Sequence, residues 1–215
     1  MGQRPRSAGI CKGIIPDNVE KRKSEMTAKE NILSKIRDSR REKYPMPSLD
    51  ELSPVQYEDR LAQFMETVRL VGGEAVLLEP GQDINAIIRS VYPDASMIAS
   101  SLPYIDASLD PDAVSEAADL NGVDLGVVEG KIAVAENGCI WIPQTMKERA
   151  VLFISEFLII IIDRNDIVSN MHQAYEKIEN PGYGCFISGP SKTADIAQAL
   201  VMGAQAARSV TVLIR

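Results

Sequence analysis

A run of small and polar residues in the last fifth of the chain has the composition of an anion-binding loop. Residues 184–196 read Gly-Cys-Phe-Ile-Ser-Gly-Pro-Ser-Lys-Thr-Ala-Asp-Ile. The pattern predicts a strand over 184–188 and a helix from Thr193 to about Gly203. A loop between a strand and a helix N-terminus offers backbone N–H groups and the positive end of the helix dipole to an anion. The candidate ligand-binding residues are Gly189, Ser191, Lys192, Thr193 and Asp195.

This loop differs from a phosphate-binding P-loop and has a second interpretation without a ligand. In a P-loop the lysine directly follows the last glycine, whereas Lys192 lies three residues after Gly189. Ser191 or Thr193 can cap a helix, and a carboxylate such as Asp195 is favoured in the first helical turn. A well-capped strand–helix junction that binds nothing is therefore the alternative to an anion site.

A second candidate is the turn Ala135-Glu-Asn-Gly138, which separates two apolar segments. Asn-Gly between such segments predicts a tight hairpin turn, with Glu136 at its shoulder. A carboxylate held at a strand end can act as a base, a nucleophile or a ligand contact. An exposed hairpin glutamate is the alternative. Arg149 could pair with an anion near Glu136, and a surface arginine is the alternative for that residue.

Composition excludes several classes of function. The net charge of −7 argues against a dedicated nucleic-acid-binding protein, which usually has a basic surface. The three cysteines are far apart and predict neither a disulfide framework nor a cysteine-ligated metal or iron–sulfur site. A single histidine, His172, excludes a site with several histidine ligands. The chain also has no G-x-G-x-x-G fingerprint, so no cofactor is expected.

No segment of the sequence is apolar over the roughly 20 residues that a membrane-spanning helix needs. The longest apolar run is Phe157–Ile162, and the N-terminus has no continuous apolar stretch of the kind found in secretory signals. The sequence thus predicts a cytoplasmic, reducing location.

The N-terminal part of the chain differs in charge from the rest. Residues 1–45 carry 12 Lys and Arg against 6 Asp and Glu, although the whole chain is acidic. Residues 1–25 have no apolar periodicity and are predicted to be a disordered leader. A capping box, Thr27-Ala-Lys-Glu30, then predicts the first helix. We expect 26–215 to form a single domain.

Strands and helices are predicted to alternate along this domain. Such alternation is typical of an α/β fold with a mixed or mainly parallel sheet and helices on both faces. Two N-terminal helices are expected, the first from Thr27 and the second from about Pro54 to Val71. Further helices are expected at 84–91, 112–118, 167–178 and 193–203, and strands at 74–78, 97–99, 123–129, 131–135, 139–142, 157–162, 184–188 and 210–214.

The loop and the hairpin turn together resemble the LUD-domain family, whose best-known branch is lactate-utilisation protein C. The resemblance rests on Ile187-Ser-Gly-Pro-Ser-Lys-Thr-Ala-Asp-Ile196 and on Ala135-Glu-Asn-Gly138. It extends from about Thr27 to Arg215 and is strongest from Val123 onward. The resemblance implies a fold similar to that of the sugar-phosphate isomerase and CoA-transferase superfamily.

The family resemblance also implies a function. It implies a component of L-lactate utilisation that carries no cluster and works with iron–sulfur partner proteins in the oxidation of lactate to pyruvate. Family members usually carry Gly-Val-His-Gly-Pro after the last helix, whereas this chain has Gly203-Ala-Gln-Ala-Ala207. A diverged paralogue is therefore an open alternative.

Two further functions remain open at this stage. In the related CoA-transferases a glutamate in a similar turn forms an acyl anhydride, and Glu136 would be that nucleophile in an acyl- or CoA-transferring enzyme. Alternatively, the chain is a regulatory domain that senses a small anion and needs no chemistry at Glu136.

The cysteine count gives the first testable prediction. The protein purified alone under anaerobic conditions should show no iron–sulfur absorbance, because three scattered cysteines cannot supply four ligands. Absorbance spectroscopy with iron and sulfide analysis checks this, and stoichiometric iron and sulfide on the monomer would contradict it.

Overall fold

The computed structural model describes residues 27–39, 44–45, 47–48, 52–179, 182–194 and 199–215. Two compact units, 1–51 and 52–215, are described separately. In the first unit, helix α1 (Ala28–Asp38) begins with the predicted capping box. The Thr27 hydroxyl accepts from the Glu30 N–H, and the Glu30 carboxylate accepts from the Thr27 N–H at 2.8 Å. The predicted leader, 1–25, lies outside the described residues, so it stays a prediction.

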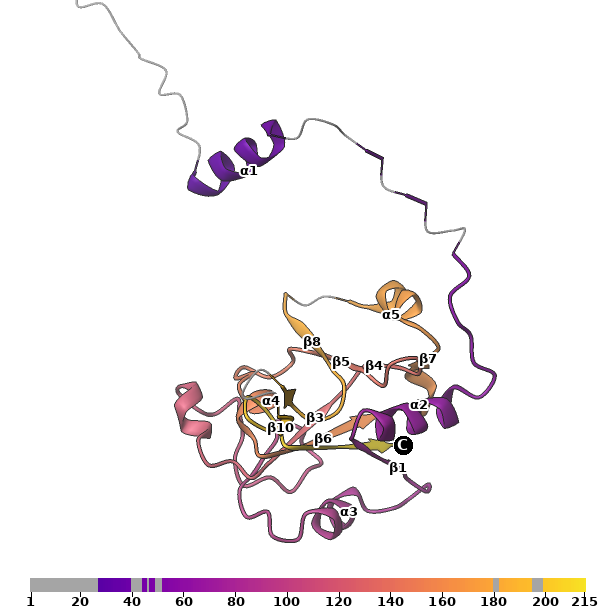
Figure 1. Ribbon diagram of the computed structural model, residues 1–215. Coiled ribbons are helices and arrows are strands. Elements are labelled where there is room, and N and C mark those ends of the chain that lie inside the picture. Colours follow the sequence, from indigo (N-terminus) through magenta and orange to yellow (C-terminus); the bar gives the residue numbers. More distant parts are fainter. Residues whose placement is uncertain (1–26, 40–43, 46, 49–51, 180–181, 195–198) are drawn as a thin grey trace, which may run out of the picture. The chain divides into compact units, whose positions relative to one another are not determined.

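The second unit is built on a parallel sheet of five strands (Figure 1). The order is β1-β11-β6-β3-β2, and every neighbouring pair is parallel. The strands are β1 (Glu74–Leu77), β2 (Ile98–Ala99), β3 (Leu125–Glu129), β6 (Phe157–Ile162) and β11 (Ser209–Ile214). The central strand β6 is the predicted apolar run, and its last five residues are buried. The predicted α/β class with a mainly parallel sheet is confirmed.

A second sheet, which the sequence did not predict as a separate layer, contains four strands in the order β7-β4-β5-β8. These are β4 (Ile132–Val134), β5 (Ile140–Pro143), β7 (Ile167–Val168) and β8 (Gly184–Ile187). Strands β4 and β5 are antiparallel across the Asn137-Gly138 turn, so the predicted hairpin is confirmed. The antiparallel pairing of β5 with β8 completes this sheet on the side of the candidate loop.

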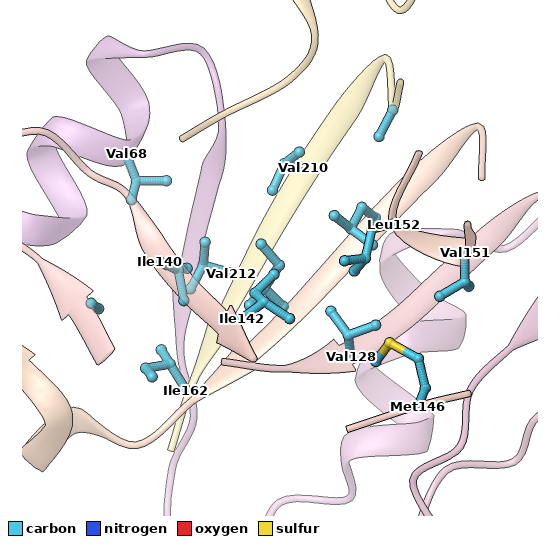
Figure 2. Packing of buried hydrophobic residues seen from close by; sticks show 14 of the residues in the cluster. Val68, Val128, Ile140, Ile142, Met146, Val151, Leu152, Ile162, Val210 and Val212 are labelled. Carbon is cyan, nitrogen blue, oxygen red and sulfur yellow. The ribbon is translucent and has the colours of Figure 1, made fainter. Parts of the chain in front are cut away.

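Successive side chains of β6 point to opposite faces of the parallel sheet, so the hydrophobic core has one layer on each face. Ile159 and Ile161 pack with Ile88 of α3 on one face of the parallel sheet. Leu158, Ile160 and Ile162 pack on the other face, against helices α2 and α4 and the second sheet. Figure 2 shows this larger cluster, with Ile140 and Ile142 of β5 lying beside Val212 of β11. The helices are α2 (Arg60–Leu70), α3 (Ile84–Val91), α4 (Val151–Ile154) and α5 (Met171–Lys177), with 3₁₀ turns at Ala117–Leu120 and Arg164–Asp166.

Three predicted helices differ from the structure. The helix expected at 167–178 begins as strand β7 and becomes α5 only at Met171, because β7 pairs with β4. The helix expected at 112–118 is a short 3₁₀ turn at Ala117–Leu120. The second helix begins at Arg60 rather than near Pro54, with Asp59 as its N-cap.

The helix predicted from Thr193 to Gly203 is wrong at both described ends. Lys192–Thr193 forms strand β9 and Val201–Met202 forms strand β10, and the two strands are antiparallel. Residues 195–198, including Asp195, lie outside the described residues. The backbone hydrogen bonds explain the difference, because Gly203 N–H donates to Ser191 O and Ser191 N–H donates to Ala207 O, both at 2.9 Å. Such pairing between the two ends of the segment outweighs local helix propensity.

Across the described residues, no helix combines the length and the apolar character that crossing a membrane requires.

The central position of β6 gives a prediction for stability. Strand β6 lies between β11 and β3, and the side chain of Ile160 is fully buried. Ile160→Ala should therefore lower the free energy of unfolding by about 2–5 kcal/mol, because apolar burial is lost and a cavity remains. Chemical denaturation measures this change. The control Leu70→Ala removes a leucine that is 75% exposed and should change stability by about 0.5 kcal/mol or less. Equal effects of the two variants would contradict the assignment of β6 as the core strand.

Candidate functional site

The hairpin turn and the candidate loop, about 50 residues apart in sequence, lie side by side. The Ser188 hydroxyl donates to the Asn137 carbonyl oxygen at 2.8 Å. Strand β5, which follows the hairpin turn, pairs with β8, which leads into the loop, and Ile140 lies opposite Ile187. The second sheet therefore brings together the two segments that the sequence singled out.

Both segments rest on the last turn of helix α2. The Thr67 hydroxyl donates to the Ala135 carbonyl oxygen at 2.9 Å. Gly138 has a φ of +66°, and a Cβ there would lie 3.2 Å from the Val68 nitrogen. Gly189 has a φ of +63°, and a Cβ there would lie 2.6 Å from the Val71 carbonyl oxygen. Glycine is required at both positions for the backbone conformation and for the close approach to α2.

Lys192 also contacts the end of α2. Its ammonium donates a hydrogen bond to the carbonyl oxygen of Val71, the C-cap residue of that helix. A positive charge at a helix C-terminus is favourable because the helix dipole is negative there. An ammonium has three donors, so this contact positions the charge of Lys192 and leaves two donors for another acceptor.

A cavity of about 400 Å³ opens beside the loop. The loop supplies Ser188 to Lys192 to its lining, and α4 supplies Leu152 and Phe153. Lys192 is the one charged side chain among the described residues that line it. The remaining lining residues are Leu158, Phe186, Ile187, Gln205, Ala206, Ala207 and Val210.

Two of the expected sources of anion affinity are absent from the described loop. No helix begins at Thr193, which lies in β9 opposite Val201, so no helix dipole adds to the charge there. The Ser191 N–H is not available to a ligand, because it donates to the Ala207 carbonyl oxygen. Anion binding at Gly189, Ser191, Lys192 and Thr193 stays a prediction, and it now depends mainly on the charge of Lys192.

Glu136 has a structural partner that sequence reasoning missed. Its Oε1 accepts from the N–H of Met171, the first residue of α5, at 3.0 Å. Its own N–H donates to the Ser169 carbonyl oxygen at 3.1 Å. Glu136 is half-buried and helps to cap α5, together with Asn170, whose side chain accepts from the Gln173 N–H. In the sequence, the signal for the start of α5 was Asn170, because asparagine is a favoured N-cap residue.

Arg149 is not part of the cavity. It is exposed, and its guanidinium stacks over the ring of Tyr183, 4.4 Å from the ring centroid. The residues that line the cavity do not include it. The structure therefore brings Glu136 and Lys192 to one region of the fold and places Arg149 in a separate contact.

The two described cysteines are poor nucleophiles. Cys139, which follows the hairpin turn, is buried, and burial raises the pKa of its thiol to about 12. Burial also raises the pKa of the half-buried Cys185 thiol. Both thiols stay protonated at neutral pH, and reactivity requires the thiolate. Nowhere in the described part of the chain do three or more His, Cys, Asp or Glu side chains gather as metal ligands would.

The apolar wall of the cavity was the main feature that sequence reasoning did not assign to the site. Leu152 and Phe153 come from the short helix α4, and Ala206 and Ala207 come from the segment before β11. The sequence signals were the short apolar stretch after Arg149 and the small residues 203–207, but neither shows which part of the fold it faces.

Comparisons with known proteins found similar sequences and a similar fold for this part of the chain. A family model described as the LUD domain matches residues 100–214, which include the hairpin turn, α4 and the loop. Lactate utilization protein C of Shouchella clausii (strain KSM-K16) is 34% identical over 88 residues. That match covers 37% of this chain and 38% of the relative, so the chain spans well under half of that protein's length.

A solved structure with a similar fold is a DUF162 family protein from Deinococcus radiodurans. The TM-score is 0.55 with 16% sequence identity, over 75% of this chain and 99% of that one. The likeness at this identity shows the fold.

The cap on α5 gives a prediction for Glu136. Glu136→Ala should lower the free energy of unfolding by about 0.5–2 kcal/mol, because the Met171 N–H loses its acceptor. Glu136→Gln should cost less, because its amide oxygen can still accept that bond. Chemical denaturation measures both, with Glu176→Ala on the exposed face of α5 as control. Equal stability of Glu136→Ala and wild type would show that this contact contributes nothing to the fold.

Proposed function

The chain belongs to the LUD-domain family, and we propose on this basis that it is a component of L-lactate utilisation. In this proposal it carries no cluster of its own and works in the cytoplasm with iron–sulfur partner proteins that oxidise lactate to pyruvate. The name of the 34% identical relative, lactate utilization protein C, supports the substrate. The sequence motif in residues 187–196 and the hairpin turn at 135–138 carry the resemblance.

The observation that carries the proposal is the cavity beside the loop. Its lining includes Lys192, Ser188 and Ser191 together with a larger set of apolar residues. A small organic anion matches this combination, since its carboxylate can accept from Lys192 while its carbon atoms contact the wall. Lactate belongs to this chemical class.

The number and burial of the cysteines support separate roles for this chain and its partners. The sequence has three cysteines, and the two that the structure describes are held protonated by burial. A four-cysteine cluster cannot be assembled from them. We therefore assign electron transfer to the partners and binding of the organic acid to this chain.

The contacts of Glu136 favour this binding role over acyl transfer. A nucleophilic carboxylate has to reach the substrate, whereas Oε1 of Glu136 is engaged by the Met171 N–H. Residues that line the cavity also do not include Glu136.

The test is titration of L-lactate into wild type, Lys192→Ala and Lys147→Ala, followed by calorimetry or NMR shifts. Lys147 is a matched control because its ammonium also donates to a backbone carbonyl, that of Val114 at 2.9 Å, but it does not line the cavity. Loss of one charged contact of about 0.5–2 kcal/mol predicts lactate affinity lower by about 2- to 30-fold in Lys192→Ala. Lys147→Ala should bind as wild type does.

Two outcomes would contradict the proposal. Equal lactate affinity of wild type and Lys192→Ala would show that the loop is not the binding site. Undiminished lactate-dependent dye reduction by the iron–sulfur proteins when this chain is omitted would show that it is not a component of their reaction.

A further inference from the structure

The cavity beside Lys192 is larger than a three-carbon acid requires. Pockets of about 300–1,000 Å³ hold drug-sized ligands, and this one measures about 400 Å³. Lactate at Lys192 would leave most of this volume to water. The cavity therefore has room for a ligand with a longer body.

The lining combines polar side chains from the loop with apolar side chains from several other elements. Ser188, Ser191 and Lys192 all come from the loop. Leu152, Leu158 and Val210 come from α4, β6 and β11, and all three belong to the buried core cluster. Figure 2 shows Leu152 and Val210 on the same side of the parallel sheet. A ligand that fills the cavity thus has a polar head near the loop and an apolar tail near α4.

Phe153 marks the apolar wall as a contact surface. It follows the buried Leu152 on α4, lines the cavity and is 42% exposed. Together with the partly exposed Phe186 and Ile187 it forms an apolar part of the lining, and ligand pockets are lined mainly by such side chains. An apolar tail that covers Phe153 would remove this surface from water.

The charge of the lining limits the head group. Lys192 supplies one positive charge, and the described lining residues include no carboxylate. Its ammonium is positioned by the Val71 carbonyl oxygen and has two donors left. One cation with two donors matches a carboxylate, whereas a phosphate dianion or a nucleotide would need more positive charge. The hollow lined by Asp94, Asp124 and Glu156 would instead repel an anion.

We propose that this cavity binds a monocarboxylate whose apolar chain is longer than that of lactate. The carboxylate accepts from Lys192, and the chain packs on Phe153 and on the partly exposed Phe186 and Ile187. The inference rests on the proposed function, since it uses the same cavity, and it changes the substrate class from lactate alone to longer organic acids.

The test is a chain-length series of L-lactate, butyrate, hexanoate and octanoate, titrated into wild type by calorimetry or NMR below micelle-forming concentrations. Each added methylene that enters the cavity should raise the affinity about fourfold until the cavity is full. Inorganic phosphate should bind more weakly than octanoate.

Three variants locate the binding. Phe153→Ala should lower the ratio of octanoate to lactate affinity about tenfold, because it removes the apolar wall. Lys192→Ala should weaken every carboxylate in the series. Leu70→Ala, which removes an exposed leucine outside the cavity, should match wild type. Thermal unfolding of each variant shows that the fold is retained, and Phe153 is exposed enough for its replacement to be tolerated.

The outcomes separate this inference from the proposed function. Lysine-dependent lactate binding without any chain-length effect overturns the inference and leaves the proposed function standing. Octanoate binding without lactate binding supports the inference and overturns lactate as the substrate. A chain-length effect that is equal in wild type, Phe153→Ala and Lys192→Ala places the binding elsewhere and overturns the inference, and absence of binding by every acid overturns both.

Discussion

The site depends on the last turn of α2, where two distant segments are held against one helix. Thr67 bonds the backbone before the hairpin turn, and the Val71 carbonyl oxygen receives the ammonium of Lys192. Gly138 and Gly189 allow both segments to approach within van der Waals distance of the helix. The position of the loop therefore depends on where α2 ends: the helix runs from Arg60 to Leu70, Val71 is its C-cap, and the next residue, Gly72, has a φ of +83°. Only a residue without a Cβ adopts that conformation at little cost.

The second sheet is the element that makes this arrangement possible. Without the second sheet, no strand pairing would join the hairpin to the loop. Instead, β4 and β5 turn back over the parallel sheet and present an edge to β8, which carries the chain directly into the loop. Apolar side chains of β5 fill the space between the two sheets, so the loop is anchored to the main core through Ile140 and Ile142.

Local signals in the sequence were sufficient for part of this structure. The capping box at Thr27, the Asn137-Gly138 turn and the continuous apolar run of β6 each involve neighbouring residues, and each is confirmed. The helix expected after Thr193 failed because Ser191 pairs with Gly203 and Ala207, and no local pattern shows such pairing. For the same reason the partner of Glu136, the N–H of Met171, was not predictable. The contact between Ser188 and Asn137 depends on the second sheet, in which β5 pairs with β8.

The order of strands in the parallel sheet has a consequence for synthesis of the protein. Strand β11 lies between β1 and β6, both of which precede it in the chain. Glu74 pairs with Thr211, so the ribosome must deliver more than 130 further residues before β1 acquires its neighbour. Until then one side of the isoleucine-rich β6 is an open edge, and open apolar edges are sites of aggregation. The parallel sheet is therefore complete only after β11 has been synthesised, and until then the edge of β6 that β11 covers can pair with another chain.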